Sequence, residues 1–315
     1  MSEVNVSTLH LARRIVLDYV APPPGILENL SGCAANESHL WTVSDEGRSI
    51  ERLERHMSGY RFDAPIPLDD LIPGIPGDPD DELDLESLDF ADSMLWICGS
   101  HCKARRKPQG SEQVSPVIRE RNSRRLLARI KFQEDGQTPS GADFLPFDGV
   151  ESLRDHLEKD PFLSPYKDLP TKEGGFDIEG LAVVNDNVFL GLRGPVVGGF
   201  AVIVELALNS AFRIVSHKLH FVDLGGLAVR ELARNGSSML IIAGPVGEAL
   251  GPFSLQTWQP GASHTERILT WDTIAEKPEG MCCATIDGEI GLLLLHDSPS
   301  ARINGAKYEA DWLVP

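Results

Sequence analysis

Three glutamates occupy equivalent places in successive copies of a degenerate repeat, each at the start of an apolar hairpin. They are Glu86, Glu179 and Glu279. Carboxylates gathered around one point repel each other unless a cation, a shared proton or an arginine compensates them. Calcium takes about six to eight oxygen ligands in proteins. The three glutamates, with Asp45 from a further copy, therefore predict a calcium site.

The same carboxylates have a second interpretation that needs no metal. They are then hydrated groups in a water-filled channel, or partners of Arg193 and Arg230. Both interpretations place the acidic side chains together, and they differ only in what compensates the charge.

A bound cation would support hydrolysis, because it polarises a phosphoryl or carbonyl oxygen. We expect His101 and His296 to move protons and Arg193 to complete the catalytic set, although each histidine also has a structural interpretation. An anionic small molecule such as a phosphoester is the expected substrate, since arginine and lysine recognise such groups. The predicted anion-binding residues are Arg193, Lys103, Arg105 and Arg106.

Short β-hairpins are the elements that must position these residues. The clearest copy is segment 178–192, in which two apolar runs flank a polar turn. A constant nine-residue offset separates equivalent positions in three copies: Ser31 and Leu40, Glu86 and Leu95, Glu179 and Val188.

Five copies begin near residues 30, 85, 178, 224 and 278. Most steps are about 45 to 55 residues, the length of a four-stranded propeller blade. The sequence therefore predicts an all-β protein, a single propeller domain over residues 1–315 with five blades. A strand predicted at 15–20 precedes the first hairpin, and we expect it to close the ring beside the last strand, 308–313.

One step in the repeat is too long. Segment 103–175 holds a basic stretch, a strand predicted at 126–132, and a helix predicted at 150–159 with Asp148 as its N-cap. We interpret it as an insertion in the second blade. A sixth, degenerate blade hidden in this segment is the alternative.

Composition excludes several classes of protein. The net charge of −18 argues against nucleic acid as a partner. No apolar run approaches the roughly 18 residues that a membrane span requires, so no membrane contact is expected. The N-terminus lacks a secretory signal, and the five cysteines are an odd number. Both features predict a cytoplasmic protein with reduced thiols.

Two adjacent segments carry opposite charge, acidic at 69–92 and basic at 103–131. They support an alternative function in which the propeller is not an enzyme but binds a protein partner through these loops.

A family resemblance rests on the segment Lys172–Val183, KEGGFDIEGLAV, and on Gly191–Pro195, GLRGP. These motifs resemble the bacterial family catalogued as domain of unknown function 3616, which implies a fold and no reaction. Repeated Glu-Gly-Leu openings are also similar to those of phytase-like esterase and SdiA-regulated propellers, and more remotely to gluconolactonase-type propellers that hold calcium in the channel. Ser31 and Gly225 replace the acid in two copies, a departure from a full set. Further segments that carry the resemblance are Ser44–Gly47, Gly99–His101, Phe221–Val229, Ala243–Pro245 and Lys277–Gly280.

Overall fold

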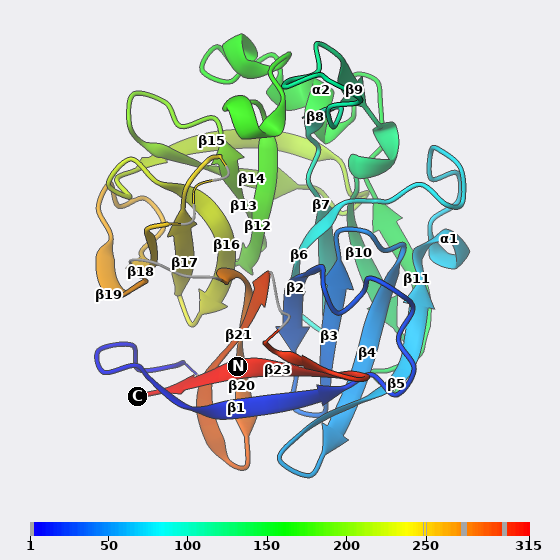
Figure 1. Cartoon of the computed structure of the whole chain (residues 1–315), viewed down its shortest axis with the longest axis vertical. Helices are drawn as coiled ribbons and strands as arrows, with labels where there is room; N and C mark the ends of the chain where they lie inside the picture. The colour runs from blue at the N-terminus through cyan, green and yellow to red at the C-terminus, as the bar shows by residue number, and fades with distance from the viewer. Residues whose placement is uncertain (1–2, 248, 250, 272–275, 298–300) are drawn as a thin grey trace.

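The protein is described by a computed structural model that covers residues 3–247, 249, 251–271, 276–297 and 301–315. Antiparallel sheets are arranged around a common axis, with little helix (Figure 1). Within the described residues, no helix is both long enough and apolar enough to cross a membrane.

Three of the sheets share one plan, with four antiparallel strands each. From the axis outward their strands are β6 (Leu85–Ala91), β7 (Met94–Gly99), β10 (Leu127–Phe132) and β11 (Pro139–Phe144); β12 (Asp177–Val184), β13 (Asn187–Gly194), β14 (Ala201–Leu208) and β15 (Ile214–Val222); and β16 (Ala228–Asn235), β17 (Ser238–Gly244), β18 (Phe253–Trp258) and β19 (Glu266–Trp271).

The remaining large sheet contains both ends of the chain. Strand β1 pairs antiparallel with β23, from His10 opposite Val314 to Asp18 opposite Lys307, and it also pairs in parallel with β5. The prediction that an N-terminal strand closes the ring is confirmed. The strands of this sheet are β2 (Leu30–Ala35), β3 (His39–Ser44), β4 (Ser49–His56), β5 (Gly59–Pro67), β1 (His10–Asp18), β23 (Lys307–Val314), β21 (Glu289–Asp297) and β20 (Lys277–Ile286), with β22 (Ile303–Asn304) beside β23.

The innermost strands pack against one another in a closed order, β2 on β6, β6 on β12, β12 on β16, β16 on β20, and β20 on β2. Glycine permits this close approach at the motif positions. A Cβ on Gly180 would lie 2.7 Å from the Leu232 backbone nitrogen, and one on Gly32 would lie 2.6 Å from the Glu86 carbonyl oxygen. The glycine that follows Glu179 in the repeat is therefore required by packing at the axis.

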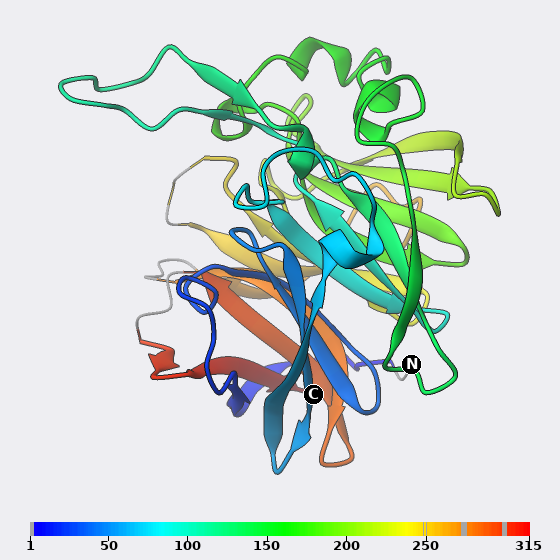
Figure 2. The same ribbon diagram turned by 90° about the vertical axis from the view of Figure 1, so that its right-hand side faces the viewer.

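The long segment 103–175 has several parts. Strands β8 (Lys103–Arg105) and β9 (Ile118–Glu120) pair only with each other and belong to an arm that projects from the body (Figure 2). The strand predicted at 126–132 is β10, the third strand of its sheet. The short elements are α1 (Leu68–Leu71), η1 (Asn122–Arg124), α2 (Leu153–Leu157), η2 (Ser164–Tyr166) and η3 (Thr171–Glu173).

The predicted N-cap of the helix is wrong. Ser152, not Asp148, caps α2, because its hydroxyl accepts a hydrogen bond from the Asp155 backbone N–H at 3.2 Å.

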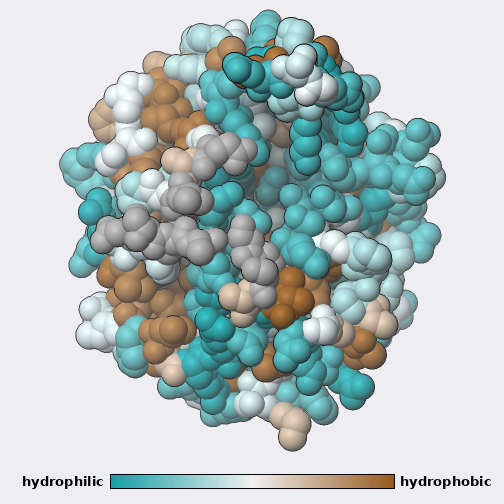
Figure 3. Space-filling model, in the orientation of Figure 1, coloured by the Kyte–Doolittle hydropathy of each residue, from teal (hydrophilic) through white to brown (hydrophobic). Residues whose placement is uncertain are grey.

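The sheets bury apolar side chains between them. Trp41 stacks on Phe90 across two sheets with ring centroids 4.9 Å apart. Hydrophilic residues predominate around the middle of the face in Figure 3.

Candidate functional site

One side chain at the start of each innermost strand is displaced by a β-bulge. The register shifts between Leu30 and Gly32, Leu85 and Ser87, Ile178 and Gly180, Val229 and Glu231, and Pro278 and Met281. Bulges re-aim side chains and are frequent beside active sites. The residues within these bulges include Ser31, Glu86, Glu179, Arg230 and Glu279.

The fourth repeat copy was assigned wrongly from the sequence. Gly225 was expected at the position of the acid, but Gly225 and Gly226 lie before β16 with φ angles of +72° and +82°. Arg230 occupies the equivalent bulge. The sheet of β16 to β19 therefore contributes a cation between Glu179 on β12 and Glu279 on β20.

A cavity of about 420 Å³, here called the mouth cavity, opens where these bulges lie. Ten carboxyl side chains and seven basic ones are among the described residues that line it, and no aromatic side chain is among them. Both the predicted metal ligands and Arg193 line the cavity. The predicted ligands are Asp45, Glu86, Glu179 and Glu279.

Two arginines compensate Glu179. Its Oε1 pairs with Arg193, and its Oε2 lies 2.7 Å from Arg230 Nε. Arg230 also pairs with Glu279 through Nη2, and Arg193 Nη2 lies 2.6 Å from Asp177 Oδ2. The interpretation that pairs the acids with Arg193 and Arg230 describes this arrangement.

The calcium hypothesis does not fit this arrangement. Both oxygens of Glu179 face guanidinium groups at the place where a metal would have to bind. Among the described residues, no group of three or more His, Cys, Asp or Glu side chains is arranged to hold a metal ion. Calcium needs several converging oxygens that are free to bind it, and arginines already engage both oxygens of Glu179.

Two carboxyl groups in the cavity are not compensated in this way. Within the described part of the chain, Glu86 forms no ion pair; burial, and then the neighbouring Glu179 carboxylate, raise its pKa well above the usual range. Burial, followed by the charges of Asp84 and Glu279, raises the pKa of Asp45 to about 8. Burial also raises the pKa of Glu179 to about 7, although Arg193 and Arg230 oppose the shift.

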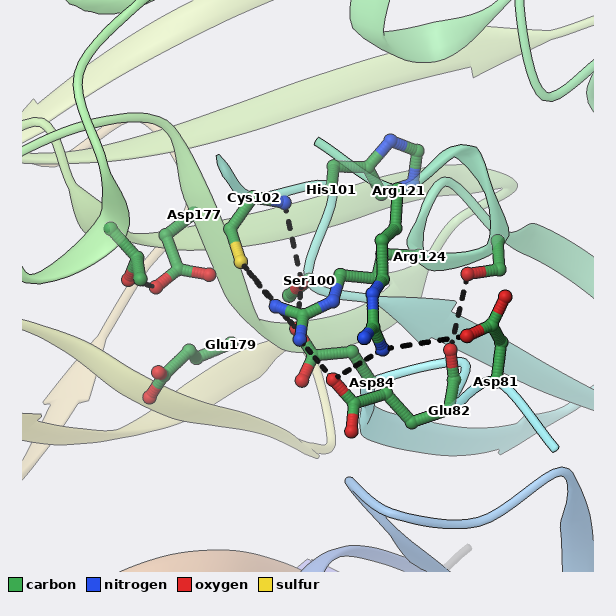
Figure 4. Close-up of polar contacts among 12 residues, drawn as sticks. Asp81, Glu82, Asp84, Ser100, His101, Cys102, Arg121, Arg124, Asp177 and Glu179 are labelled. Atoms are coloured by element: carbon green, nitrogen blue, oxygen red, sulfur yellow. Dashed lines mark hydrogen bonds and ion pairs between the residues drawn. The ribbon is translucent and has the colours of Figure 1, made fainter. Parts of the chain in front are cut away.

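A second group of polar residues, from the turn after β7 and the segment before β6, borders the same cavity (Figure 4). Arg124 Nη1 lies 2.9 Å from Asp84 Oδ2 and 3.1 Å from Cys102 Sγ. Ser100 donates its hydroxyl proton to Asp84. Burial raises the pKa of the Cys102 thiol well above its ordinary value, so Cys102 is a neutral thiol.

Sequence reasoning missed Asp84 and Asp177, although the sequence contains a signal for both. Each aspartate precedes a bulged glutamate by two residues, as Asp84-Leu85-Glu86 and Asp177-Ile178-Glu179. All four of these acids line the cavity. The repeated Asp-x-Glu pattern is therefore the sequence signal for the pairs of acids at the cavity.

The two predicted catalytic histidines do not line the mouth cavity. His101 is buried, its Nε2–H donates to the Leu126 carbonyl at 3.1 Å, and burial lowers its pKa to about 3. Its ring points away from Asp177 and Glu179 in Figure 4. His296 is also buried, with Nε2 2.9 Å from Asp311 Oδ2. We assign neither histidine a role at this cavity.

The predicted anion-binding residues all have carboxylate partners. Lys103 Nζ lies 3.0 Å from Asp168 Oδ1, and Arg105 Nη2 lies 2.8 Å from Glu173 Oε2. Arg106 Nη2 lies 2.6 Å from a Glu112 oxygen. An anion would have to compete with these partners, as it would at Arg193.

Residues 29–309 match the family described as Protein of unknown function (DUF3616). The chain belongs to this family. The resemblance that the sequence motifs predicted is thereby confirmed. A search of curated proteins finds no match to this DUF3616 chain.

Solved structures with a similar fold include three enzymes. An exo-β-1,3-galactanase from Clostridium thermocellum has a TM-score of 0.51 at 9% identity, over 96% of this chain and 62% of the galactanase chain. A glutaminyl cyclase from Myxococcus xanthus has a TM-score of 0.48 at 10% identity, over 97% and 95% of the two chains. The soluble aldose sugar dehydrogenase from Escherichia coli has a TM-score of 0.44 at 11% identity, over 98% and 100%. At such identities the likeness concerns the fold alone, and of these three only the galactanase has a TM-score above 0.5. The sheets of the DUF3616 chain itself, packed in closed order, make it an all-β, propeller-like fold.

Proposed function

We propose that this DUF3616 chain is a single five-bladed propeller whose mouth cavity is an acid–base hydrolase site for small polar esters. The blade count is supported by the five innermost strands, which pack in closed order around the axis. The two halves of the largest sheet, β2 to β5 and β20 to β1, are then the first and last blades. Four strands belong to each blade in this description.

A single observation carries the proposed chemistry: Glu86 and Glu179 lie on neighbouring innermost strands but in opposite electrostatic settings. Glu179 has two arginine partners. Glu86 has no ion-pair partner among the described residues, and the Glu179 carboxylate disfavours its ionisation. A pair of carboxyl groups whose environments separate their pKa values supplies one acid and one base.

The reaction follows from these two protonation states. Glu179 takes a proton from the attacking water as the water oxygen bonds to the ester carbonyl carbon. Glu86 gives its proton to the leaving alkoxide as the carbon–oxygen bond breaks. The products are an acid and an alcohol, and a proton then passes from Glu179 back to Glu86 through solvent. Arg193 and Arg230 are positioning residues, because they hold the Glu179 carboxylate in place.

The first experiment is a screen of purified full-length chain against chromogenic carboxyl esters, lactones and phosphoesters. We expect turnover of carboxyl esters or lactones that falls by about 100-fold or more in Glu86→Gln and in Glu179→Gln. Glu54→Gln is the matched control, since Glu54 is exposed on β4. Turnover that survives both cavity substitutions would exclude this site.

The pH profile separates acid and base. The rate should rise as Glu179 loses its proton near pH 7 and fall at higher pH as Glu86 ionises. Glu86→Gln should remove only the falling limb of any residual activity. The calcium prediction is tested alongside: a melting temperature that is the same in calcium and in chelator would remove it.

The alternative function, a non-enzymatic propeller that binds a protein partner, is supported by the arm that carries β8 and β9. Its tip exposes apolar side chains, with Val114 67% and Val117 45% exposed. The acidic and basic segments themselves pair largely within the chain, as Arg121 Nη1 does with Glu82 Oε1 at 3.1 Å. A pull-down at increasing salt concentration, with and without Val114→Ser, tests this alternative.

A further inference from the structure

One carboxylate oxygen in the mouth cavity has no hydrogen-bond donor despite complete burial. Asp177 is 0% exposed, and its Oδ2 is engaged by the Thr171 hydroxyl and by Arg193. Its Oδ1 is buried and has no hydrogen-bond partner among the described residues. Leaving a buried carboxylate oxygen without a donor is costly, so the position calls for a donor from a ligand.

The residue that carries the unpartnered oxygen lies at the wall of the mouth cavity. Asp177 and Cys102 both line the mouth cavity, and in Figure 4 the Asp177 carboxyl group extends from β12 toward Cys102. Asp45, which directly follows β3, supplies a second buried carboxyl oxygen without a partner, its Oδ1. Two residues with an unpartnered acceptor thus line the same cavity.

Charge as well as hydrogen bonding is unbalanced in this part of the cavity. Six of the ten carboxyl groups that line the cavity are Asp45, Asp84, Glu86, Asp177, Glu179 and Glu279. Arg124, Arg193 and Arg230 pair with four of these six, namely Asp84, Asp177, Glu179 and Glu279. Cys102 adds no charge, because it is a neutral thiol. Over the whole lining, ten carboxyl groups stand against seven basic side chains, so the cavity attracts a cation once its carboxyl groups ionise. The net charge of −18 steers cations toward the whole molecule.

We propose that the mouth cavity binds substrates that carry a protonated amine, with the ammonium group donating to Asp177 Oδ1 and Asp45 Oδ1. This inference rests on the proposed hydrolase function for its turnover and on the geometry alone for its binding. An ammonium group suits the site because its N–H donors bind carboxylates at hydrogen-bond distance without demanding a full shell of oxygens. A calcium ion would demand that shell beside three guanidinium groups.

A consequence distinguishes an ammonium ligand from a neutral hydroxyl ligand. Before a cation enters, the crowded acids relieve their repulsion by keeping protons on Glu86 and Asp45. An ammonium group replaces those protons as the compensating charge. Binding of an amine should therefore release protons and should tighten as the pH rises from 6 to 8, whereas binding of a diol should do neither.

The binding experiment uses the full chain and calorimetry with 1,4-diaminobutane and the neutral 1,4-butanediol, in two buffers of different ionisation enthalpy. We expect the diamine to bind with proton release and the diol not to bind. Asp177→Asn and Asp45→Asn should each weaken diamine binding at least tenfold. Asp186→Asn, in the exposed turn between β12 and β13, should leave it unchanged.

Asp45→Asn keeps the test valid if Asp177→Asn fails to fold, since Asp45 makes no ion pair among the described residues. Equal binding of diol and diamine would overturn the inference, as would diamine binding that neither substitution weakens. Calcium that binds and displaces the diamine would also overturn it, in favour of a metal site.

The turnover experiment compares glycine ethyl ester with ethyl propionate, which has a methyl group in place of the ammonium. After correction for the uncatalysed rates, we expect kcat/KM to favour the glycine ester at least tenfold, and Asp177→Asn to abolish the preference. Equal turnover of both esters would overturn the inference and leave the hydrolase proposal intact. Diamine binding without turnover of any ester would support the inference about binding and overturn the hydrolase proposal.

Discussion

The mouth cavity and the sheet that contains both ends of the chain bury the same kinds of side chain, but only in that sheet do acidic and basic groups compensate each other. There, a group called here the closing network consists of Glu276, His296, Arg302 and Asp311. Arg302 meets Asp311 at 2.8 and 3.0 Å and Glu276 at 2.8 Å, and His296 meets Asp311 at 2.9 Å. Although burial opposes it, hydrogen bonds from His296 and Arg302 hold the pKa of Asp311 well below its usual range.

The mouth cavity shows the opposite behaviour. There burial and neighbouring carboxylates raise the pKa values of Asp45, Glu86 and Glu179. A network that lowers its carboxyl pKa values stabilises the fold, whereas one that raises them costs stability. Such a cost at a cavity is typical of sites that bind or react, and a balanced pair at a strand junction is typical of structure.

The largest expected effect comes from breaking the balanced network. Arg302→Met removes the cation from Asp311 and Glu276, and we expect the free energy of unfolding to fall by about 3–5 kcal/mol. Urea denaturation at pH 7 measures it, with Lys307→Met as the control because Lys307 is exposed on β23, the strand that carries Asp311.

The pH dependence of that loss follows from the direction of the shift. The folded pKa of Asp311 is depressed, so its contribution is present above the unfolded value near 4 and is lost as the pH falls through the folded pKa. The deficit of Arg302→Met should therefore shrink in acid. A deficit under about 1 kcal/mol at pH 7 would mean that the closing network does not stabilise the fold.

Much of this arrangement could be predicted from the sequence, because the repeat records strand register. The spacing that relates Glu86 to Glu179 reflects equivalent bulges on β6 and β12. Ring closure by β1 followed from counting strands in the last copy. Both inferences depend on local patterns that each sheet repeats.

The sequence predictions for Gly225 and His101 were wrong because the pairing between strands and the local turn, and not the similarity of short motifs, determine where these residues lie. Gly225 looks like a motif position, but the pairing of Val229 with Ala243 and of Glu231 with Ile242 extrudes Arg230 instead. His101 follows the strand that ends at the cavity, yet a φ of +55° at that residue turns the chain, and its Nε2 bonds to the Leu126 backbone carbonyl. The residues that flank Gly225 and His101 in the sequence indicate neither the strand register nor the φ angle.

The second effect is a gain of stability at the mouth. Asp45→Asn removes a carboxyl group whose pKa rises from 3.8 to about 8 on folding. Its favourable contribution is present below the unfolded value and is lost as the pH rises toward 8, so wild-type stability should decline over that range. The full shift corresponds to about 6 kcal/mol; with solvent screening in the open cavity, we expect a gain of about 1–3 kcal/mol at pH 8.

Urea denaturation at pH 5 and pH 8 measures this gain, which should be smaller at pH 5. Asp186→Asn, exposed at the far end of its hairpin, should change stability equally at both values. If the free energies of unfolding of Asp45→Asn and wild type changed in parallel from pH 5 to 8, the carboxyl groups of the mouth cavity would be as well compensated as those of the closing network. The contrast between the two regions would then be lost.

The smallest expected effect is a pKa change that tests whether the carboxyl groups of the mouth cavity influence each other's ionisation. Glu279 raises the pKa of Asp45 by its charge, second only to Asp84 among the charged neighbours. Glu279→Gln should therefore lower the pKa of Asp45, by about half a unit, as followed by carboxyl ¹³C NMR. The pKa of Asp311 serves as the internal reference and should stay fixed, since its partners are His296 and Arg302. If the substitution shifted the pKa of Asp311 and not that of Asp45, Glu279 would be coupled to the closing network and not to the carboxyl groups of the mouth cavity.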